Sequence, residues 1–242
     1  MTKLSVNLNK VALLRNARRS GSPDIAQAAR LCIAAGAHGL TLHPRPDERH
    51  AKPVDVEMVA ELLRSEPTIE LNVEGNPLHT LLPIVRRVRP TQCTLVPDDA
   101  GARTSDHGWD LERDGERLRP VVAELKEQRI RVSLFIEAGS CDLEIARDIG
   151  ADRVELYTEA YAAAYDTANS ETVFERYADT ARRAQALGLG VNAGHDLSLE
   201  NLGKFCTIPG IEEVSIGHAL IGDALMLGLG GAVRAYLARL PQ

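Results

Sequence analysis

Eight short segments rich in apolar and β-branched residues alternate with eight longer segments of helical pattern along this chain. Several of the short segments are nearly continuous apolar runs, which is typical of parallel strands covered by helices. At three junctions a glycine (Gly36, Gly150 or Gly188) follows a helical segment just before a new strand. The predicted strands span residues 3–8, 39–43, 69–74, 92–97, 131–137, 152–157, 190–193 and 213–216. The predicted helices span residues 25–35, 54–65, 78–88, 111–128, 143–149, 170–187, 198–205 and 219–240.

This alternation predicts an α/β fold, a closed (β/α)8 or TIM barrel, because eight such units fit within 242 residues with few large insertions. An open doubly wound sheet is the alternative, but it rarely needs eight regular repeats. The chain has no linker rich in glycine, serine or proline, so residues 1–242 are predicted to form one domain. Two segments exceed the minimal barrel: residues 10–24 near the N-terminus, and the loop 98–110, which holds the only tryptophan, Trp109.

Composition narrows the class of protein. A hydrophobic content of 44% and a charged content of 26% are ordinary for a soluble globular protein. The net charge of −6 argues against a nucleic-acid partner, and no apolar run approaches the roughly 20 residues of a membrane span. The first residues have a strand pattern rather than that of a signal peptide. Because four scattered cysteines (Cys32, Cys93, Cys141 and Cys206) match no metal-site spacing, we expect reduced, mostly buried thiols in a cytoplasmic protein.

Polar residues gather where the predicted strands end, which is where barrels of this type carry their catalytic residues. Four of the seven histidines lie just past a strand end: His43, His50, His195 and His218. A single loop histidine most often has a structural role, but four on one rim favour a functional site, because imidazoles transfer protons near neutral pH. Arg45, between His43 and His50, could bind a phosphate or carboxylate. The other polar residues at or beyond strand ends include Asn7, Asn9, Lys10, Arg18, Glu74, Thr104, Tyr157 and Asp196.

Two glutamates stand out among these positions. Glu155 lies between Val154 and Leu156 in an apolar strand, so its carboxylate points either into the barrel or at the helices. A buried carboxylate is costly unless it is paired or neutral, and the alternatives here are a catalytic group and a structural ion pair. Glu74 ends its strand, where a raised pKa would suit a general base. A helix N-cap or a surface acid is equally compatible with its position.

Glycine–histidine pairs follow the seventh and eighth predicted strands, at Gly194-His195 and Gly217-His218. This is the usual place of a phosphate site in such barrels, because glycine lets backbone N–H groups approach an anion. The alternative is that Gly194 and Gly217 only form tight turns. The histidines lack the i, i+4 spacing of a metal site, and no nucleotide-binding glycine motif is present, so we predict no metal and no nucleotide cofactor.

The order of motifs along the whole chain resembles the pyridoxine 5′-phosphate synthase family. The motifs that carry this resemblance are residues 6–9 (Val-Asn-Leu-Asn), 14–18 (Leu-Arg-Asn-Ala-Arg), 39–50 (Gly-Leu-Thr-Leu-His-Pro-Arg-Pro-Asp-Glu-Arg-His), 72–74 (Asn-Val-Glu), 93–97 (Cys-Thr-Leu-Val-Pro), 131–136 (Arg-Val-Ser-Leu-Phe-Ile), 191–195 (Val-Asn-Ala-Gly-His) and 216–219 (Ile-Gly-His-Ala). The resemblance implies a homo-oligomeric barrel, an octamer, that needs no metal or organic cofactor. It also implies condensation of two phosphorylated small molecules, 1-deoxy-D-xylulose 5-phosphate and 3-amino-2-oxopropyl phosphate, to pyridoxine 5′-phosphate, phosphate and water.

The resemblance also implies roles for individual residues. His43 and Glu74 correspond to the proton-transfer bases, His195 to the general acid, and Glu155 to the residue that stabilises the transition state. The group that would hold the deoxyxylulose phosphate comprises Arg45, His50 and Thr104. The group that would hold the aminoketone phosphate comprises Asn7, Arg18, Gly217 and His218.

Three departures from the family pattern concern the site. Asn9 and Lys10 stand where an aspartate and a histidine are common, Asp196 where many members have glycine, and Glu159 where glycine is common. We interpret these changes as retuned substrate contacts, and the alternative is a changed substrate. Two other functions stay open: a barrel aldolase or isomerase that uses Lys10 for a Schiff base, and a non-catalytic protein that binds phosphorylated metabolites.

Overall fold

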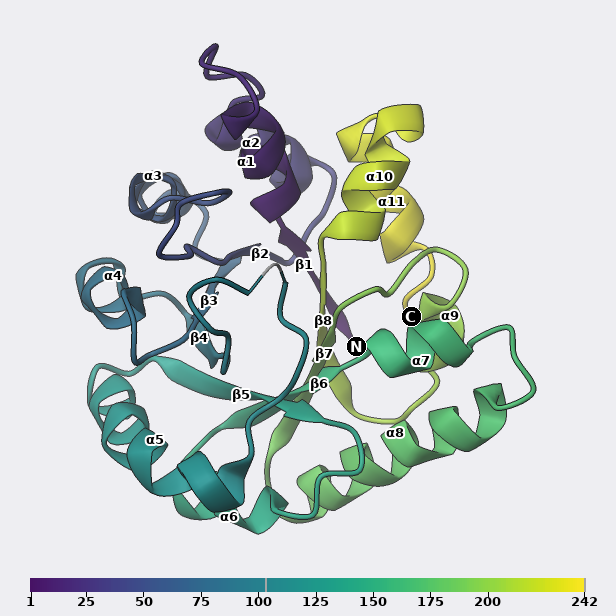
Figure 1. The fold of residues 1–242 in the computed structure, drawn as a ribbon. Coiled ribbons are helices and arrows are strands. Elements are labelled where there is room, and N and C mark those ends of the chain that lie inside the picture. Colours follow the sequence, from purple (N-terminus) through teal and green to yellow (C-terminus); the bar gives the residue numbers. More distant parts are fainter. Residues whose placement is uncertain (103, 242) are drawn as a thin grey trace.

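The computed structural model describes residues 1–102 and 104–241 and shows a closed barrel of eight parallel strands (Figure 1). Each strand pairs with the next in the sequence, and the last pairs with the first, with Leu4 opposite Val214. This confirms the predicted (β/α)8 barrel, and each predicted strand overlaps an observed one. The strands are β1 (Lys3–Asn7), β2 (Gly39–Leu42), β3 (Glu70–Gly75), β4 (Gln92–Leu95), β5 (Arg131–Glu137), β6 (Arg153–Tyr157), β7 (Gly190–Gly194) and β8 (Ile211–Ile216).

Helices surround the barrel on its outer side (Figure 1). They are α1 (Asn9–Asn16), α2 (Ile25–Ala34), α3 (Pro53–Leu63), α4 (Leu81–Val88), α5 (Leu111–Glu127), α6 (Leu143–Asp148), α7 (Glu159–Ala164), α8 (Ser170–Ala186), α9 (Leu202–Phe205), α10 (His218–Leu227) and α11 (Leu229–Leu237). Within the described residues, none of them is long and apolar enough to cross a bilayer.

Several helical predictions were wrong in detail. The predicted helix 219–240 is two helices, because Gly228 adopts a left-handed φ of 69° between α10 and α11. The predicted helix 198–205 shrinks to α9, since the Asn201 side chain accepts a hydrogen bond from Ser198 N at 2.8 Å and holds that segment in a turn. Helix α7 was not predicted. The additional segment 10–24 begins as α1, so it supplies a helix at the rim of the barrel.

Side chains alternate between the two faces of each strand. On β6, Val154 and Leu156 are fully buried in the apolar core between strands and helices, whereas Glu155 faces the inside of the barrel, where it accepts a hydrogen bond from Thr94 on β4. Hydrogen-bonded polar side chains occupy much of this interior, in place of the branched apolar layers usual in such barrels. They include Ser5, Thr41, Asn72, Gln92, Thr94, Asn192, Glu213 and Ser215.

The loop 98–110 is anchored at its far end by Trp109. The Trp109 indole N–H donates to the Leu95 carbonyl at 2.9 Å, and its backbone N–H donates to the Phe135 carbonyl at 2.8 Å. Gly108 packs so closely on β5 that a Cβ there would overlap the backbone of Ile136. The loop therefore runs against the carboxyl ends of β4 and β5.

Candidate active site

A cavity of about 500 Å³ opens at the carboxyl ends of the strands. All predicted site residues except Arg18 line it. Arg18 is exposed beyond the end of α1, and the structure does not bring it to this cavity. The lining residues are Asn7, Asn9, Lys10, His43, Arg45, His50, Glu74, Val96, Thr104, Ser105, Phe135, Glu155, Tyr157, Glu159, His195, Asp196, Ser215, Gly217 and His218.

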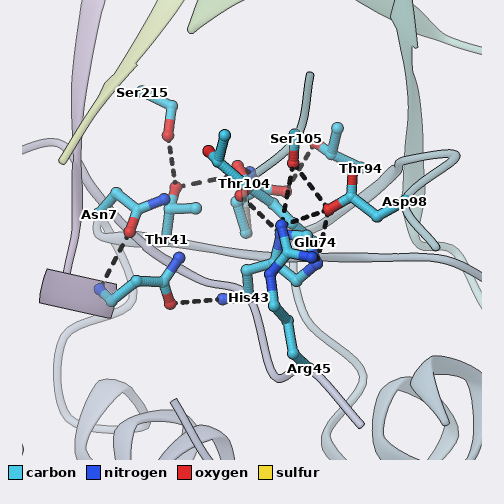
Figure 2. A network of polar contacts seen from close by, with 12 residues as sticks. Asn7, Thr41, His43, Arg45, Glu74, Thr94, Asp98, Thr104, Ser105 and Ser215 are labelled. Carbon is cyan, nitrogen blue, oxygen red and sulfur yellow. Dashed lines mark hydrogen bonds and ion pairs between the residues drawn. The ribbon is translucent and has the colours of Figure 1, made fainter. Parts of the chain in front are cut away.

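His43 lies at the end of β2 between two carboxylates (Figure 2). Its Nδ1 is 3.7 Å from Glu74 Oε2, and its Nε2 is 3.7 Å from Asp98 Oδ2. Its backbone N–H donates to Asn9 Oδ1 at 2.9 Å, so the amide at the first departure from the family pattern holds the histidine backbone. Burial and then the nearby Arg45 charge hold the pKa of His43 well below its usual value. The imidazole is therefore neutral near pH 7 and can accept a proton.

Glu74 and Glu155 both face the barrel interior. Asn72 Nδ2 donates to Glu74 Oε1 at 3.3 Å, and Thr94 Oγ1 donates to Glu155 Oε2 at 3.3 Å. Burial and then the Asp98 charge raise the pKa of Glu74 to about 8, and burial raises the pKa of Glu155 well above its usual value. Among the ion pairs of the described residues none involves Glu155, so a structural ion pair is not its role there. Glu74 does not cap α4, whose N-cap is Thr80.

Gly194 makes room for Glu155. A Cβ on Gly194 would overlap the Glu155 Oε1 atom. At Gly217 a Cβ would lie 3.1 Å from the Asn7 Cβ, closer than most side chains tolerate. These glycines therefore do more than form turns, because each permits a polar side chain to reach the cavity.

His195 follows β7 at the mouth of the cavity. It and Asp196 have left-handed φ angles of 88° and 55°, which are uncommon for residues other than glycine. The Tyr157 ring packs edge-on against the imidazole with centroids 5.1 Å apart, and Thr104 Oγ1 is 3.4 Å from His195 Nε2. Such strain is typical of functional sites, and here it directs a partly exposed imidazole towards the loop 98–110.

Arg45 and His50 form one side of the cavity. The Arg45 guanidinium is buried in an ion pair with Asp98 and donates from NH1 to the Ala102 carbonyl at 3.1 Å, but its Nε has no partner among the described residues. His50 Nδ1 is likewise buried without a partner. Burial and then Arg45 lower the pKa of His50 to about 4, so this ring is neutral. Arg49, from the same loop, also donates to the Ala102 carbonyl.

Helix α1 contacts the loop between β2 and α3, which carries Arg45 and His50. Asn16 Nδ2 approaches three backbone carbonyls of this segment, those of Glu48, Arg49 and His50, at 3.2, 3.0 and 2.8 Å. Arg15 forms a bidentate ion pair with Asp55 at the start of α3, with NH2 to Oδ2 at 2.8 Å. The N-terminal addition thus fixes the position of the loop between β2 and α3.

Lys10 lines the cavity from the first turn of α1, and its positive charge contributes to lowering the pKa of both His50 and Asp196. The side chains that the prediction missed include Asp98 and Ser105, which contact the Arg45 guanidinium. The only signal for Asp98 was an acid placed directly after an apolar strand and a proline. Among the described residues, no group of three or more histidine, cysteine or acidic side chains is arranged to hold a metal ion.

Comparison with known proteins identifies the family. A family model described as "Pyridoxal phosphate biosynthesis protein PdxJ" matches residues 4–242. The chain is 53% identical over 247 residues to a pyridoxine 5′-phosphate synthase of Albidiferax ferrireducens, covering 100% of this chain and 98% of that protein. It is 53% identical over 245 residues to one of Xanthomonas campestris pv. campestris, covering 98% and 95%.

Solved structures with far lower identity share the fold alone. A thiamine phosphate pyrophosphorylase from Pyrococcus furiosus superposes with a TM-score of 0.61 at 12% identity, over 98% of this chain and 94% of that chain. A 4-hydroxy-2-oxoglutarate aldolase superposes with a TM-score of 0.63 at 15% identity, with the same coverage. Since the family match spans nearly the whole sequence, the chain belongs to the PdxJ family of pyridoxal phosphate biosynthesis proteins.

Proposed function

We propose that this protein is a pyridoxine 5′-phosphate synthase of vitamin B6 biosynthesis. In this reaction 1-deoxy-D-xylulose 5-phosphate condenses with 3-amino-2-oxopropyl phosphate, and pyridoxine 5′-phosphate, inorganic phosphate and water leave. The observation that carries the proposal is the grouping of His43, Glu74, Glu155 and His195 around one cavity. The curated relatives at 53% identity support the same function.

The reaction needs repeated proton transfers, because imine formation, phosphate loss and ring closure each move protons between carbon, nitrogen and oxygen. His43 is neutral and can take the first proton. Glu74 is the second base, and its raised pKa suits it to exchange protons near neutral pH. His195, at the mouth, donates a proton to the leaving group. Glu155 ionises as positive charge develops in the buried site and so stabilises the transition state.

Each substrate carries a phosphate, and the cavity has two regions suited to anions. Arg45 and His50 lie on one side, each with a buried nitrogen that no described residue satisfies. Gly217 and His218 lie at the N-terminus of α10, where backbone N–H groups and the helix dipole favour negative charge. We assign the deoxyxylulose phosphate, with Thr104, to the first region and the aminoketone phosphate, with Asn7, to the second. Asn9, Lys10 and Asp196 complete the substrate contacts.

The test is to mix both substrates with the purified protein without added metal and to follow product absorbance and free phosphate. His43→Ala and His195→Ala should each reduce kcat by about a hundredfold or more, the usual contribution of general acid–base groups. Absence of product with fresh substrates would reject the synthase. Activity that survives both substitutions would reject the assigned roles.

Lys10 motivates a second candidate, an aldolase or isomerase, because it is a lysine that lines the cavity. Borohydride trapping of a phosphorylated ketone on Lys10, lost in Lys10→Arg, would favour this function. Tight binding of both phosphates without turnover at any pH would instead indicate a non-catalytic binding protein.

We further infer that the protein self-associates, as an octamer, in the cytoplasm. Nearly all residues of α10 are apolar, yet Leu225, Met226 and Leu227 are 73%, 87% and 52% exposed, and only Leu220 is buried. Helices with so much apolar surface are usually covered by a partner. Four free cysteines fit a reducing compartment. Light scattering should give eight times the chain mass, and Met226→Lys should lower it. A monomeric wild type would reject the assembly.

A further inference from the structure

The buried carboxylate of Asp98 has no role in the mechanism above. It follows β4 directly after Val96 and Pro97 and is 2% exposed. Asn76 Nδ2 donates to its backbone carbonyl at 3.0 Å, which ties it to the end of β3. Asp98 does not line the main cavity, because it lies behind Arg45 and His43.

The Asp98 side chain joins two loops of the rim (Figure 2). Its Oδ2 pairs with Arg45 NH2 from the loop after β2 and accepts a hydrogen bond from Ser105 Oγ at 2.8 Å. The same oxygen is 3.7 Å from His43 Nε2. Its Oδ1 has no hydrogen-bond partner among the described residues.

Arg45 depends on this carboxylate. Its guanidinium is 4% exposed, and Asp98 is the only acid with which it forms an ion pair in the described part of the chain. A buried charge without a partner is costly, so removing one member of the pair leaves the other strongly destabilised. With NH2 held by Asp98 and NH1 by the Ala102 carbonyl, the guanidinium is fixed in the wall of the cavity, and its buried Nε has no partner among the described residues.

The Asp98 carboxylate also lies close to the two proton-transfer bases, His43 and Glu74. The titratable and charged groups that face Asp98 are His43 and Arg45, from the end of β2 and the loop after it, and Glu74 from β3. Asp98 also borders a small recess, and His79, which precedes α4, lines that recess as well. The negative charge of Asp98 adds to burial in raising the pKa of Glu74.

We propose that Asp98 is a positioning residue, which holds the Arg45 guanidinium for the phosphate of the sugar substrate and keeps a negative charge beside His43 and Glu74. This inference rests on the proposed function, since it concerns the binding group and the bases of that reaction. Asp98 itself touches no substrate in this arrangement. It acts through Arg45 and through its field on the two bases.

The test compares Asp98→Asn with Asp99→Asn, which removes the same charge from the exposed neighbour on the same loop. Asp98→Asn retains the shape and can still accept from Ser105. It should raise KM for 1-deoxy-D-xylulose 5-phosphate by about ten- to a hundredfold, the range for losing a hydrogen bond to a charged group. It should also move the acidic limb of the kcat/KM profile to lower pH, because Glu74 loses a neighbouring anion. Asp99→Asn should change neither.

An unchanged KM together with an unchanged acidic limb in folded Asp98→Asn would overturn the inference. Turnover of both substrates by the wild-type protein would, in that case, still support the proposed synthase function. If the wild type makes no product, calorimetric binding of the sugar phosphate decides: weaker binding by Asp98→Asn supports the inference and equal binding overturns it. If Asp98→Asn does not fold, Ser105→Ala replaces it. That variant should raise KM about threefold or more, and an unchanged KM would overturn the inference.

Discussion

Replacing Gly194 with alanine should disable the site through Glu155 without unfolding the barrel. The added Cβ would overlap Glu155 Oε1 and lie 3.4 Å from the Ser215 carbonyl oxygen. Glu155 is 3% exposed and has neighbouring strands on both sides, so its carboxylate must shift within the interior by about 1 Å. A displacement of that size can reduce a rate about a hundredfold. We therefore expect kcat to fall about a hundredfold while KM changes little.

The assay is the initial rate of phosphate release, with circular dichroism and melting temperature as checks on folding. Gly203→Ala is the matched control, since a Cβ there meets nothing nearer than the Arg239 carbonyl oxygen at 3.9 Å. A double-mutant cycle isolates the cause. In a Glu155→Ala background the collision disappears, so Gly194→Ala should then cost less than about threefold. A kcat within twofold of the wild type for Gly194→Ala alone, or an equal loss in both backgrounds, would refute the reasoning.

Three further predictions concern stability and the absence of a metal requirement. The pKa of Glu74 is raised from 4.5 to about 8 in the folded state, so the fold loses stability as the pH rises from the ordinary value to about 8 and loses no more above it. Glu74→Gln should therefore melt a few degrees higher than the wild type at pH 9 but not at pH 5, and equal differences at both pH values would contradict this. Arg15→Met leaves the buried Asp55 carboxylate unpaired and should lower the free energy of unfolding by about 2–3 kcal/mol in urea titrations, whereas the exposed Arg64→Met should change it by less than about 0.5 kcal/mol. Turnover should persist after dialysis against EDTA, and a loss that Mg²⁺ or Zn²⁺ restores would count against metal-free chemistry.

Much of the site could be predicted because parallel strands bring their carboxyl ends to one edge. His43, Glu74 and His195 are far apart in the sequence, yet each lies at or just past the carboxyl end of a strand, so the barrel topology alone places them on one rim. The positions of the loop residues could not be predicted in the same way. Arg18 was predicted at the site but lies exposed beyond α1, and Asp98 was not predicted although it is buried beside His43.

The sequence by itself determined the barrel, its eight strands and the rim on which the polar residues gather, because hydrophobic periodicity and strand order are local properties of the chain. Only the tertiary structure decided that Glu155 faces inward over Gly194, and that Asp98 and Arg45 neutralise each other. The physical reason is that burial and pairing depend on which loops pack together across the rim. The raised pKa of Glu74 and the lowered pKa of His43 follow from that packing rather than from their neighbours in the sequence.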